Sequence, residues 1–315
     1  MSATPLFAPL PGVPVRARLA GLAALDVAGT DALAFLHGQL SSDVKALAAG
    51  SAHYASYNSA KGRMLATMIA WHREPHRVTL VLAADLAPAI HKRLAMYVLR
   101  AKVTITASAR PLWGVVGADA RAALDGDGIA LPAAWRSARM DTADVLALPD
   151  GRFLVDCDAG LPDAMAALPE ADESLWSWAG VRAGVPQVTQ ATSDVLIAQG
   201  ANFELVGGVD FRKGCYPGQE IIARMQYLGR LKERLRAFHA DAAGIAAGTP
   251  LSSAGRDESV GTVVNAAPSP AGGVDLLAVT RLDAGDAPLF AGGHALAPRA
   301  LPYAVPALDN DRVRL

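Results

Sequence analysis

The chain has 315 residues, of which 52% are hydrophobic, and its formal net charge is −1. No apolar run approaches the roughly 18–20 residues of a membrane-spanning helix, and the proline-rich start MSATPLFAPLPGVPVRAR interrupts the apolar core that a signal peptide needs. The composition therefore argues against a membrane protein, predicts a cytoplasmic one, and leaves no global attraction to nucleic acid. The length suits two or three domains.

In the first half of the chain, apolar and polar residues alternate as in strands separated by short helices. Residues 22–29 predict a strand, and Thr30 is placed to cap a helix that buries Leu36 and Leu40. A second helix is predicted from Asp85 to about Leu99. The other predicted elements are a hairpin over 53–71, strands over 77–84, 102–107 and 112–118, and a hairpin over 144–158 that turns at Asp150-Gly151.

The second half of the chain contains two further predicted helices. Asp172 is placed to cap one of them, which Gly184 ends. Pro217 suits the first turn of the other, which runs to about Tyr227 before Gly229. Beyond Gly229, short β-like pieces between Gly, Pro and Ser clusters predict a small barrel or sandwich. Strands and helices mix without a regular βαβ alternation, so we predict an α+β fold with a boundary near residue 229.

The two cysteines form no metal-binding or disulfide pattern. Cys157 and Cys215 lie far apart in the sequence, and a structural disulfide is not expected in a reducing compartment. Cys157 belongs to the strand-like run RFLVDCD, where we expect a small buried hydrophobic side chain. Cys215 lies in FRKGCYPGQEIIAR, residues 211–224, the most densely patterned segment of the chain.

The residues around Cys215 favour a reactive thiol. Arg212 and Lys213 precede it, and a helix is predicted to start at Tyr216 or Pro217; nearby cations and helix N-termini both favour thiolate. We therefore predict a partly exposed, reactive cysteine at the edge of a pocket. The alternative is a tight GCYPG turn in which Cys215 fills a gap, because no His or Asp that could relay a proton stands near it in the sequence.

The same segment resembles the core motif of the YgfZ-type folate-binding protein family, a Lys-Gly-Cys-Tyr-x-Gly-Gln-Glu pattern. Further resemblances lie in FLHGQLSSDV (35–44), NSAKGRM (58–64), YVLRAKVTI (97–105) and WSWAGVRAGVPQV (176–188), so the similarity spans about residues 20–265. The matching motif residues are Lys213, Gly214, Cys215, Tyr216, Gly218, Gln219 and Glu220, followed by Ala223 and Arg224.

The resemblance implies a three-domain ring like that of the aminomethyltransferase T-protein, built around a tetrahydrofolate-binding hollow. The implied domains are a discontinuous folate-binding domain of residues 1–50 plus about 108–228, an inserted α+β domain of about 51–107, and a C-terminal β-barrel domain of 229–315. The implied role is the assembly, insertion or repair of 4Fe–4S clusters in client enzymes, including tRNA-thiomethylating enzymes. The implied partners are therefore these clients and cluster-assembly proteins, without a membrane and without direct nucleic-acid binding.

The resemblance also assigns residues to the site. Cys215 corresponds to the family's essential thiol, a transient cluster ligand; one cysteine cannot hold a cluster alone, so no permanently bound metal is expected. The implied cofactor is tetrahydrofolate or a derivative. The implied cofactor-binding residues are Trp176, Gln199, Asn202, Lys61 and Arg100.

Three positions depart from the family pattern. Arg182 stands where members often have Glu, Ala198 stands where Pro usually precedes Gln, and Leu22 stands at the spacing of a Trp that some members use for folate. A second such Trp corresponds to Trp176. Because Trp176 and Trp178 face different sides of the predicted helix, one is expected in the core and Trp176, by resemblance, in the pocket.

Two other functions are compatible with the sequence. The first is a folate-dependent one-carbon transferase or demethylase of the aminomethyltransferase class. In the T-protein the equivalent hairpin leads into a catalytic Asp, whereas here Lys61-Gly62-Arg63 leads into MLATMIAW, which has no carboxylate to move a proton. The second is a thiol-based redox or binding module without folate.

Residues 211–236 are strongly basic. Such a segment is a solvated face, or it contacts an anion such as the glutamate tail of folate, an acidic client or RNA phosphate. The basic residues are Arg212, Lys213, Arg224, Arg230, Lys232, Arg234 and Arg236, against the acidic Glu220 and Glu233.

Overall fold

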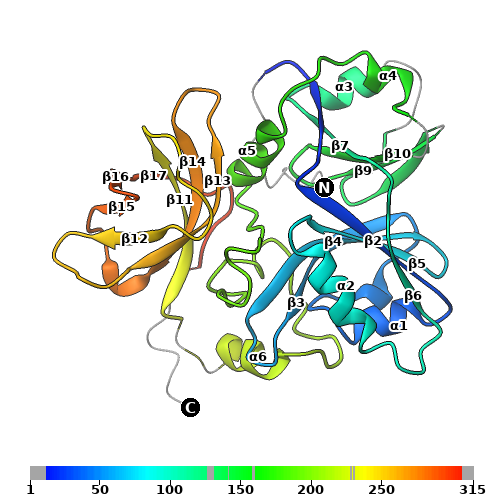
Figure 1. The fold of residues 1–315 in the computed structure, drawn as a ribbon, viewed down its shortest axis with the longest axis horizontal. Helices are drawn as coiled ribbons and strands as arrows, with labels where there is room; N and C mark the ends of the chain where they lie inside the picture. Colours follow the sequence, from blue (N-terminus) through cyan, green and yellow to red (C-terminus); the bar gives the residue numbers. More distant parts are fainter. Residues whose placement is uncertain are drawn as a thin grey trace.

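The computed structural model describes residues 12–125, 131–140, 142–157, 160–227, 229 and 231–306. These residues form three antiparallel sheets, and helix α5 (Ser174–Arg182) lies between the C-terminal sheet and the other two (Figure 1). The predicted α+β, T-protein-like fold with a C-terminal barrel-like domain is confirmed. Residues 1–11 and 307–315 of the predicted domains and Arg230 of the basic segment lie outside the described residues.

The N-terminal sheet has the strand order β3-β4-β5-β2-β6. Its strand β4 pairs with β3 and β5, and consecutive side chains are buried over nearly its whole length, so both faces of the strand are covered; this accounts for the continuous apolar run MLATMIAW. All five strands correspond to predicted ones. They are β2 (Leu22–Ala28), β3 (Ser51–Asn58), β4 (Met64–Glu74), β5 (Arg77–Ala83) and β6 (Thr104–Ala107).

The second sheet has the strand order β1-β7-β10-β9-β8. Its hairpin β9–β10 turns at Asp150-Gly151 as predicted, and Gly151 has the positive φ of 88° that such a turn needs. Cys157, the last residue of β10, is fully buried, as expected. The strands are β1 (Val15–Arg18), β7 (Leu112–Val116), β8 (Ser137–Met140), β9 (Ala143–Ala147) and β10 (Phe153–Cys157).

The C-terminal sheet curls into a nearly closed barrel-like layer with the order β16-β15-β12-β13-β14-β11-β17 (Figure 1). Its central strand β14 is buried along its length and carries much of a separate apolar core. The strands are β11 (Glu233–Ala240), β12 (Pro250–Ser253), β13 (Gly261–Pro268), β14 (Val274–Arg281), β15 (Leu289–Ala291), β16 (His294–Ala295) and β17 (Ala297–Arg299).

Two helices in the first half of the chain begin later than predicted. Helix α1 starts after Asp31, not after the predicted Thr30 cap, and the Asp31 side chain accepts a hydrogen bond from Lys102 N in place of capping the helix. Asp85 similarly accepts from Gln190 N, so α2 begins at Ala87. The helices are α1 (Ala32–His37), α2 (Ala87–Ala95), α3 (Ala120–Asp125), α4 (Asp163–Ala166), α5 and α6 (Gln219–Tyr227), with 3-10 turns η1 (Val44–Ala46) and η2 (Leu282–Ala284).

The sheets group the strands differently from the predicted domain boundaries. Strand β2, which we predicted to belong to the discontinuous folate-binding domain, pairs with β5 and β6. It therefore shares one sheet with residues that we predicted to form the inserted domain. The division into three domains itself stays a prediction.

Candidate functional site

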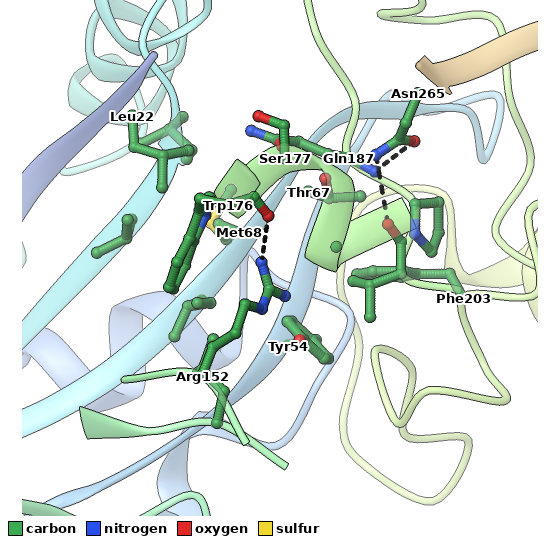
Figure 2. Close-up of a pocket in the computed structure, with 17 residues that line it drawn as sticks. Leu22, Tyr54, Thr67, Met68, Arg152, Trp176, Ser177, Gln187, Phe203 and Asn265 are labelled. Atoms are coloured by element: carbon green, nitrogen blue, oxygen red, sulfur yellow. Dashed lines mark hydrogen bonds between the residues drawn. The ribbon is translucent and has the colours of Figure 1, made fainter. Parts of the chain in front are cut away.

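A cavity of about 80 Å³ lies where the N-terminal sheet, the β9–β10 hairpin, α5 and β13 meet (Figure 2). Its walls are largely apolar, with a few polar groups that point inward. The lining residues are Leu22, Tyr54, Thr67, Met68, Ile69, Val81, Leu82, Leu148, Arg152, Trp176, Ser177, Gly180, Val185, Pro186, Gln187, Phe203 and Asn265.

Arg152 and Trp176 form the central pair of the cavity wall. The Arg152 guanidinium lies over the Trp176 ring, 4.3 Å from its centroid, and donates to the Trp176 backbone carbonyl at 3.1 Å (Figure 2). Asp150 accepts from Nε and Nη2 of Arg152 at 3.0 and 2.6 Å, which compensates the buried charge. The backbone of Gly114 is also close to the Trp176 ring, since a Cβ there would lie 2.3 Å from Cε3. Arg152 thus covers one face of the Trp176 ring, and the backbone of Gly114 packs against the same ring.

Tyr54 carries a buried polar atom that lacks a well-aligned hydrogen-bond partner. Its ring packs edge-on against Trp135 at 4.7 Å, and its side chain lies beside Arg152 in Figure 2. Burial raises the pKa of Tyr54 above its usual range, so the phenol stays protonated. Its Oη is buried and makes no hydrogen bond of good geometry within the described part of the chain, although the Arg152 guanidinium is close enough to interact with it. A buried hydroxyl that can accept or donate a further bond favours a ligand that supplies one.

Other polar groups at the cavity are held by the fold. Thr67 Oγ1 accepts from Val188 N at 2.9 Å, and Asn265 Oδ1 accepts from Gln187 N at 3.1 Å. These bonds tie strands of two sheets to the segment after α5. No Asp or Glu lines the cavity among the described residues. A carboxylate that could exchange a proton with a bound ligand is therefore missing from these walls.

A second region gathers three of the sequence motifs around Cys215. The Lys213 amino group donates to the backbone carbonyls of His37 and, at 2.6 Å, Leu40, which lie at the end of α1. It also lies 4.5 Å from the centroid of the Tyr216 ring. Burial lowers the pKa of Lys213 to about 8. Lys213 is thus a structural cation that ties the Cys215 loop to the helix end in FLHGQLSSDV.

Two glycines bring the hairpin turn of NSAKGRM against the same loop. Gly218 has φ +79°, and a Cβ on it would lie 2.4 Å from Ser59 O and 2.7 Å from Gly62 Cα. A Cβ on Gly62 would in turn lie 2.9 Å from Cβ of Ile221 in α6. Only glycine permits this approach of two backbones. The motif spacing therefore reflects a contact between segments that are distant in the sequence.

Cys215 itself is exposed. The adjacent Gly214 lies against His37, whose Nε2 would be 3.4 Å from a Cβ on Gly214. Nδ1 of His37 lies 2.9 Å from Asp43 Oδ1. Burial and the charge of Lys213 lower the pKa of His37, so its imidazole is neutral at neutral pH. A His and an Asp that the sequence did not place near the thiol are thus in its neighbourhood.

Cys215 does not lie at the edge of this cavity, and its predicted position beside a ligand pocket stays a prediction. Cys215 is not among the residues that line the cavity, and neither is any other residue of its motif. Helix α6 begins at Gln219, not at Tyr216 or Pro217, so Cys215 lies four residues before the helix. The thiol and the cavity are separate surfaces.

The predicted cofactor-binding residues are divided by the structure. Trp176 lines the cavity, but Gln199, Asn202, Lys61 and Arg100 do not. Gln199 donates to Ile222 O at 2.7 Å and Asn202 donates to Leu235 O at 3.1 Å, so both buried amides tie the segment after α5 to α6 and β11. Lys61 and Arg100 are exposed on turns. The assignment of these four residues to a cofactor stays a prediction.

The departures from the family pattern are placed as follows. Leu22 lines the cavity, Arg182 is exposed, and Ala198 is fully buried. Trp178 points away from the cavity and donates to Asp275 Oδ2 at 2.7 Å, which fixes α5 to the C-terminal sheet.

Other motif residues lie around the thiol. Tyr216 is buried, Glu220 and Arg224 are exposed on α6, and Gln219 is half-buried at its start. The described residues contain no group of three or more His, Cys, Asp or Glu side chains placed to hold a metal ion. Nor do they contain a helix long and apolar enough to cross a membrane.

The fold and cavity define a protein of the aminomethyltransferase T-protein architecture. The structure of the glycine cleavage system aminomethyltransferase T from Bartonella henselae matches with a TM-score of 0.73, covering 93% of this chain and 87% of that one. Its sequence is only 17% identical, so this likeness concerns the fold alone.

Relatives found by sequence identify the family more narrowly than this likeness in fold does. The tRNA-modifying protein YgfZ of Sodalis glossinidius is 32% identical over 295 residues, which cover 88% of this chain and 89% of that protein. The protein of the same name from Serratia proteamaculans is 34% identical over 220 residues, which cover 66% of this chain and 65% of that protein. No protein-family model matches the chain. The chain belongs to the YgfZ family, as its motifs predicted.

Proposed function

We propose that this protein binds tetrahydrofolate or a derivative in its central cavity and helps to assemble, insert or repair 4Fe–4S clusters in client enzymes, acting through Cys215. The clients include tRNA-thiomethylating enzymes, in keeping with the name of its relatives, tRNA-modifying proteins. The observation that carries the proposal is the exposed thiol, held where three family-like segments converge.

The cavity suits the flat, partly polar ring of a reduced pterin. Apolar walls from β4 and β5 would cover its faces, and the buried Tyr54 hydroxyl would bond to its polar edge. Trp176, which lines the cavity and carries Arg152 on one face, would contact the pterin from the cavity wall. When bound, the folate carries one-carbon units or reducing equivalents. The chain's own contribution is to orient the ring and to exclude water from it.

Cys215 would act as a transient ligand or sulfur relay toward a partner. A thiolate binds iron–sulfur clusters, but four ligands are normally needed. The only other cysteine, Cys157, is fully buried at the end of β10. A cluster at Cys215 would therefore take its remaining ligands from a client or an assembly protein.

A folate-dependent one-carbon transferase is the second candidate, favoured by the T-protein fold. The lining of the cavity argues against it, because the described walls hold no carboxylate. The only carboxylate in strand β4 is that of Glu74, which is exposed at the far end of the strand. Without an acid or base beside the pterin, proton transfer loses its usual catalyst.

Genetic complementation tests the proposal. Cells that lack their own YgfZ protein would be supplied with this chain or with its Cys215→Ala variant, and thiomethylated tRNA would be measured. We expect restoration by the native chain and none by a variant that folds equally well. Full restoration by Cys215→Ala would refute the role of the thiol. Turnover of a methylamine donor that depends on tetrahydrofolate would instead support the transferase.

A further inference from the structure

The surface around Cys215 is open to solvent and separate from the cavity. Since neither Cys215 nor its motif lines the cavity, a molecule that reacts with the thiol must approach from outside. We define the thiol face as the turn 60–63, the loop 211–217 and helix α6 (Gln219–Tyr227). The contacts of Gly62 with Gly218 and Ile221 hold these three segments together.

The thiol face carries mostly positive charge. Lys61 and Arg63 lie on the turn, Arg212 on the loop and Arg224 on α6, and all four are exposed. Glu220 is the exposed carboxylate among the described residues of this face. Arg63 donates from one Nη to the neutral carbonyl of Val195, and the half-buried carboxylate of Glu233 lies within its electrostatic reach. Such a concentration of cations attracts anionic partners over about a Debye length.

A hollow of about 610 Å³ adjoins the thiol face. Tyr227 at the end of α6 is 66% exposed, and its ring packs edge-on against Phe211 at 6.3 Å. The hollow thus offers an apolar, aromatic wall beside the cations, and the half-buried carboxylates of Asp43 and Asp210 also line it. Its lining is Ser42, Asp43, Ala46, Leu47, His53, Gly207, Val209, Asp210, Phe211, Arg212 and Tyr227.

We propose that the thiol face is a docking surface for an acidic segment of a partner protein, which sets acidic side chains on the exposed cations and an apolar side chain in the hollow. The exposed cations favour a partner segment with acidic side chains, because opposite charges complement each other. The aromatic wall of the hollow favours a segment that also carries an apolar side chain. The inference rests on the proposed function only in giving Cys215 a protein partner.

RNA fits this surface less well than an acidic protein. Binding of single-stranded RNA commonly uses successive exposed aromatic rings for stacking, and among the described residues of the thiol face only Tyr227 is an exposed aromatic residue. Asp43 and Asp210 line the hollow and would repel a phosphate backbone that entered it. A protein segment can keep its carboxylates at the rim and place a neutral side chain inside.

Thiol–disulfide exchange measures docking at this surface without a cofactor or a cluster. The probes are a peptide rich in Glu and Leu, its counterpart with Lys for Glu, and a short uridine oligonucleotide, each carrying a 2-pyridyl disulfide. The Cys215 thiolate attacks the probe's disulfide, a mixed disulfide forms, and 2-thiopyridone leaves and is measured by absorbance. Cys157 is fully buried, and Cys215→Ala serves as the blank.

The native chain should react about tenfold faster with the acidic peptide than with the basic one at low salt, and the ratio should approach about one in about 1 M salt. The double variant Arg212→Glu, Arg224→Glu should abolish the preference. The double variant Lys92→Glu, Arg299→Glu changes the net charge equally at exposed sites on α2 and β17 and should retain it.

A ratio below about twofold in the native chain, or an equal loss in both double variants, would overturn the proposal. Faster reaction of the oligonucleotide than of the acidic peptide would assign the surface to nucleic acid instead. Because the assay needs neither folate nor iron, a positive result would stand even if complementation by the native chain failed, so the two proposals fail separately.

Discussion

The contact between Gly218 and the hairpin turn makes a quantitative prediction. In Gly218→Ala, the new Cβ would lie 2.4 Å from Ser59 O and 2.7 Å from Gly62 Cα, so backbone must move. Gly207→Ala is a matched control, because Gly207 has nearly the same φ, +82° against +79°, but a Cβ on it meets nothing within 4 Å. The two variants share the cost of the left-handed conformation and differ in the contact.

The expected magnitudes follow from these two terms. An alanine in the left-handed region costs about 1–2 kcal/mol, and forcing a methyl group into a packed site costs about 1–3 kcal/mol more. The smaller entropy of the unfolded alanine chain offsets both variants by a similar amount, about 0.4–1 kcal/mol. Gly218→Ala should therefore lower the free energy of unfolding by about 1–3 kcal/mol more than Gly207→Ala does.

Urea unfolding followed by circular dichroism measures this difference, with the midpoint and slope compared among the native chain and both variants. A parallel measurement of alkylation at Cys215 would report whether the loop has moved. If Gly218→Ala and Gly207→Ala lose equal stability, within about 0.5 kcal/mol, the contact between the two motifs contributes nothing and the reasoning fails.

Three further predictions concern the cavity wall, the stability in acid and the attachment of α5 to the C-terminal sheet. Arg152→Met should lower the free energy of unfolding, measured by urea denaturation, by about 3–5 kcal/mol, because the buried Asp150 loses the side chain that it pairs with. Arg182 is exposed, so the control Arg182→Met should cost less than about 0.5 kcal/mol. Burial lowers the pKa of His53 to about 4, from the ordinary 6.5, so the unfolded chain binds more protons between these values. Stability should therefore fall as pH drops from about 6.5 to about 4, by roughly 3 kcal/mol at most, and His53→Gln should flatten that slope; an unchanged slope would contradict the assignment. Trp178→Phe should cost about 1–3 kcal/mol in thermal unfolding, because Asp275 Oδ2 loses its donor while Oδ1 keeps His239 Nδ1; a neutral result would exclude this bond as an anchor of α5.

Most strands could be predicted from the sequence, because alternation of apolar residues is a local property. The exact helix starts could not be predicted: α1 is preceded by Asp31 and not by the predicted Thr30 cap, and the predicted cap Asp85 accepts a hydrogen bond from the distant Gln190 N–H. Strands β1 and β8 were missed as well. Both are edge strands of only 4 residues, VRAR and SARM, and their apolar alternation is too short to stand out from the surrounding sequence.

The site was predictable only in part. The residues next to Cys215 in the sequence were enough to predict an exposed thiol, and Cys215 is exposed. Tyr54 and Arg152 come together only when β3 packs near the β9–β10 hairpin, so no spacing in the sequence reveals them. His37 likewise reaches the Cys215 loop through the Lys213 bonds. Gln199 was assigned to the cofactor by resemblance, and its bond to Ile222 O could not be foreseen because it forms between distant segments.

Calorimetric titration with tetrahydrofolate tests most directly whether cofactor and thiol occupy separate surfaces. The samples are the native chain, Cys215→Ala, and Gly180→Leu, whose side chain would enter the cavity beside Arg152. We predict that Cys215→Ala binds within about twofold of the native chain, whereas Gly180→Leu loses at least about tenfold in affinity. Loss of binding in Cys215→Ala, or native affinity in Gly180→Leu, would contradict the account.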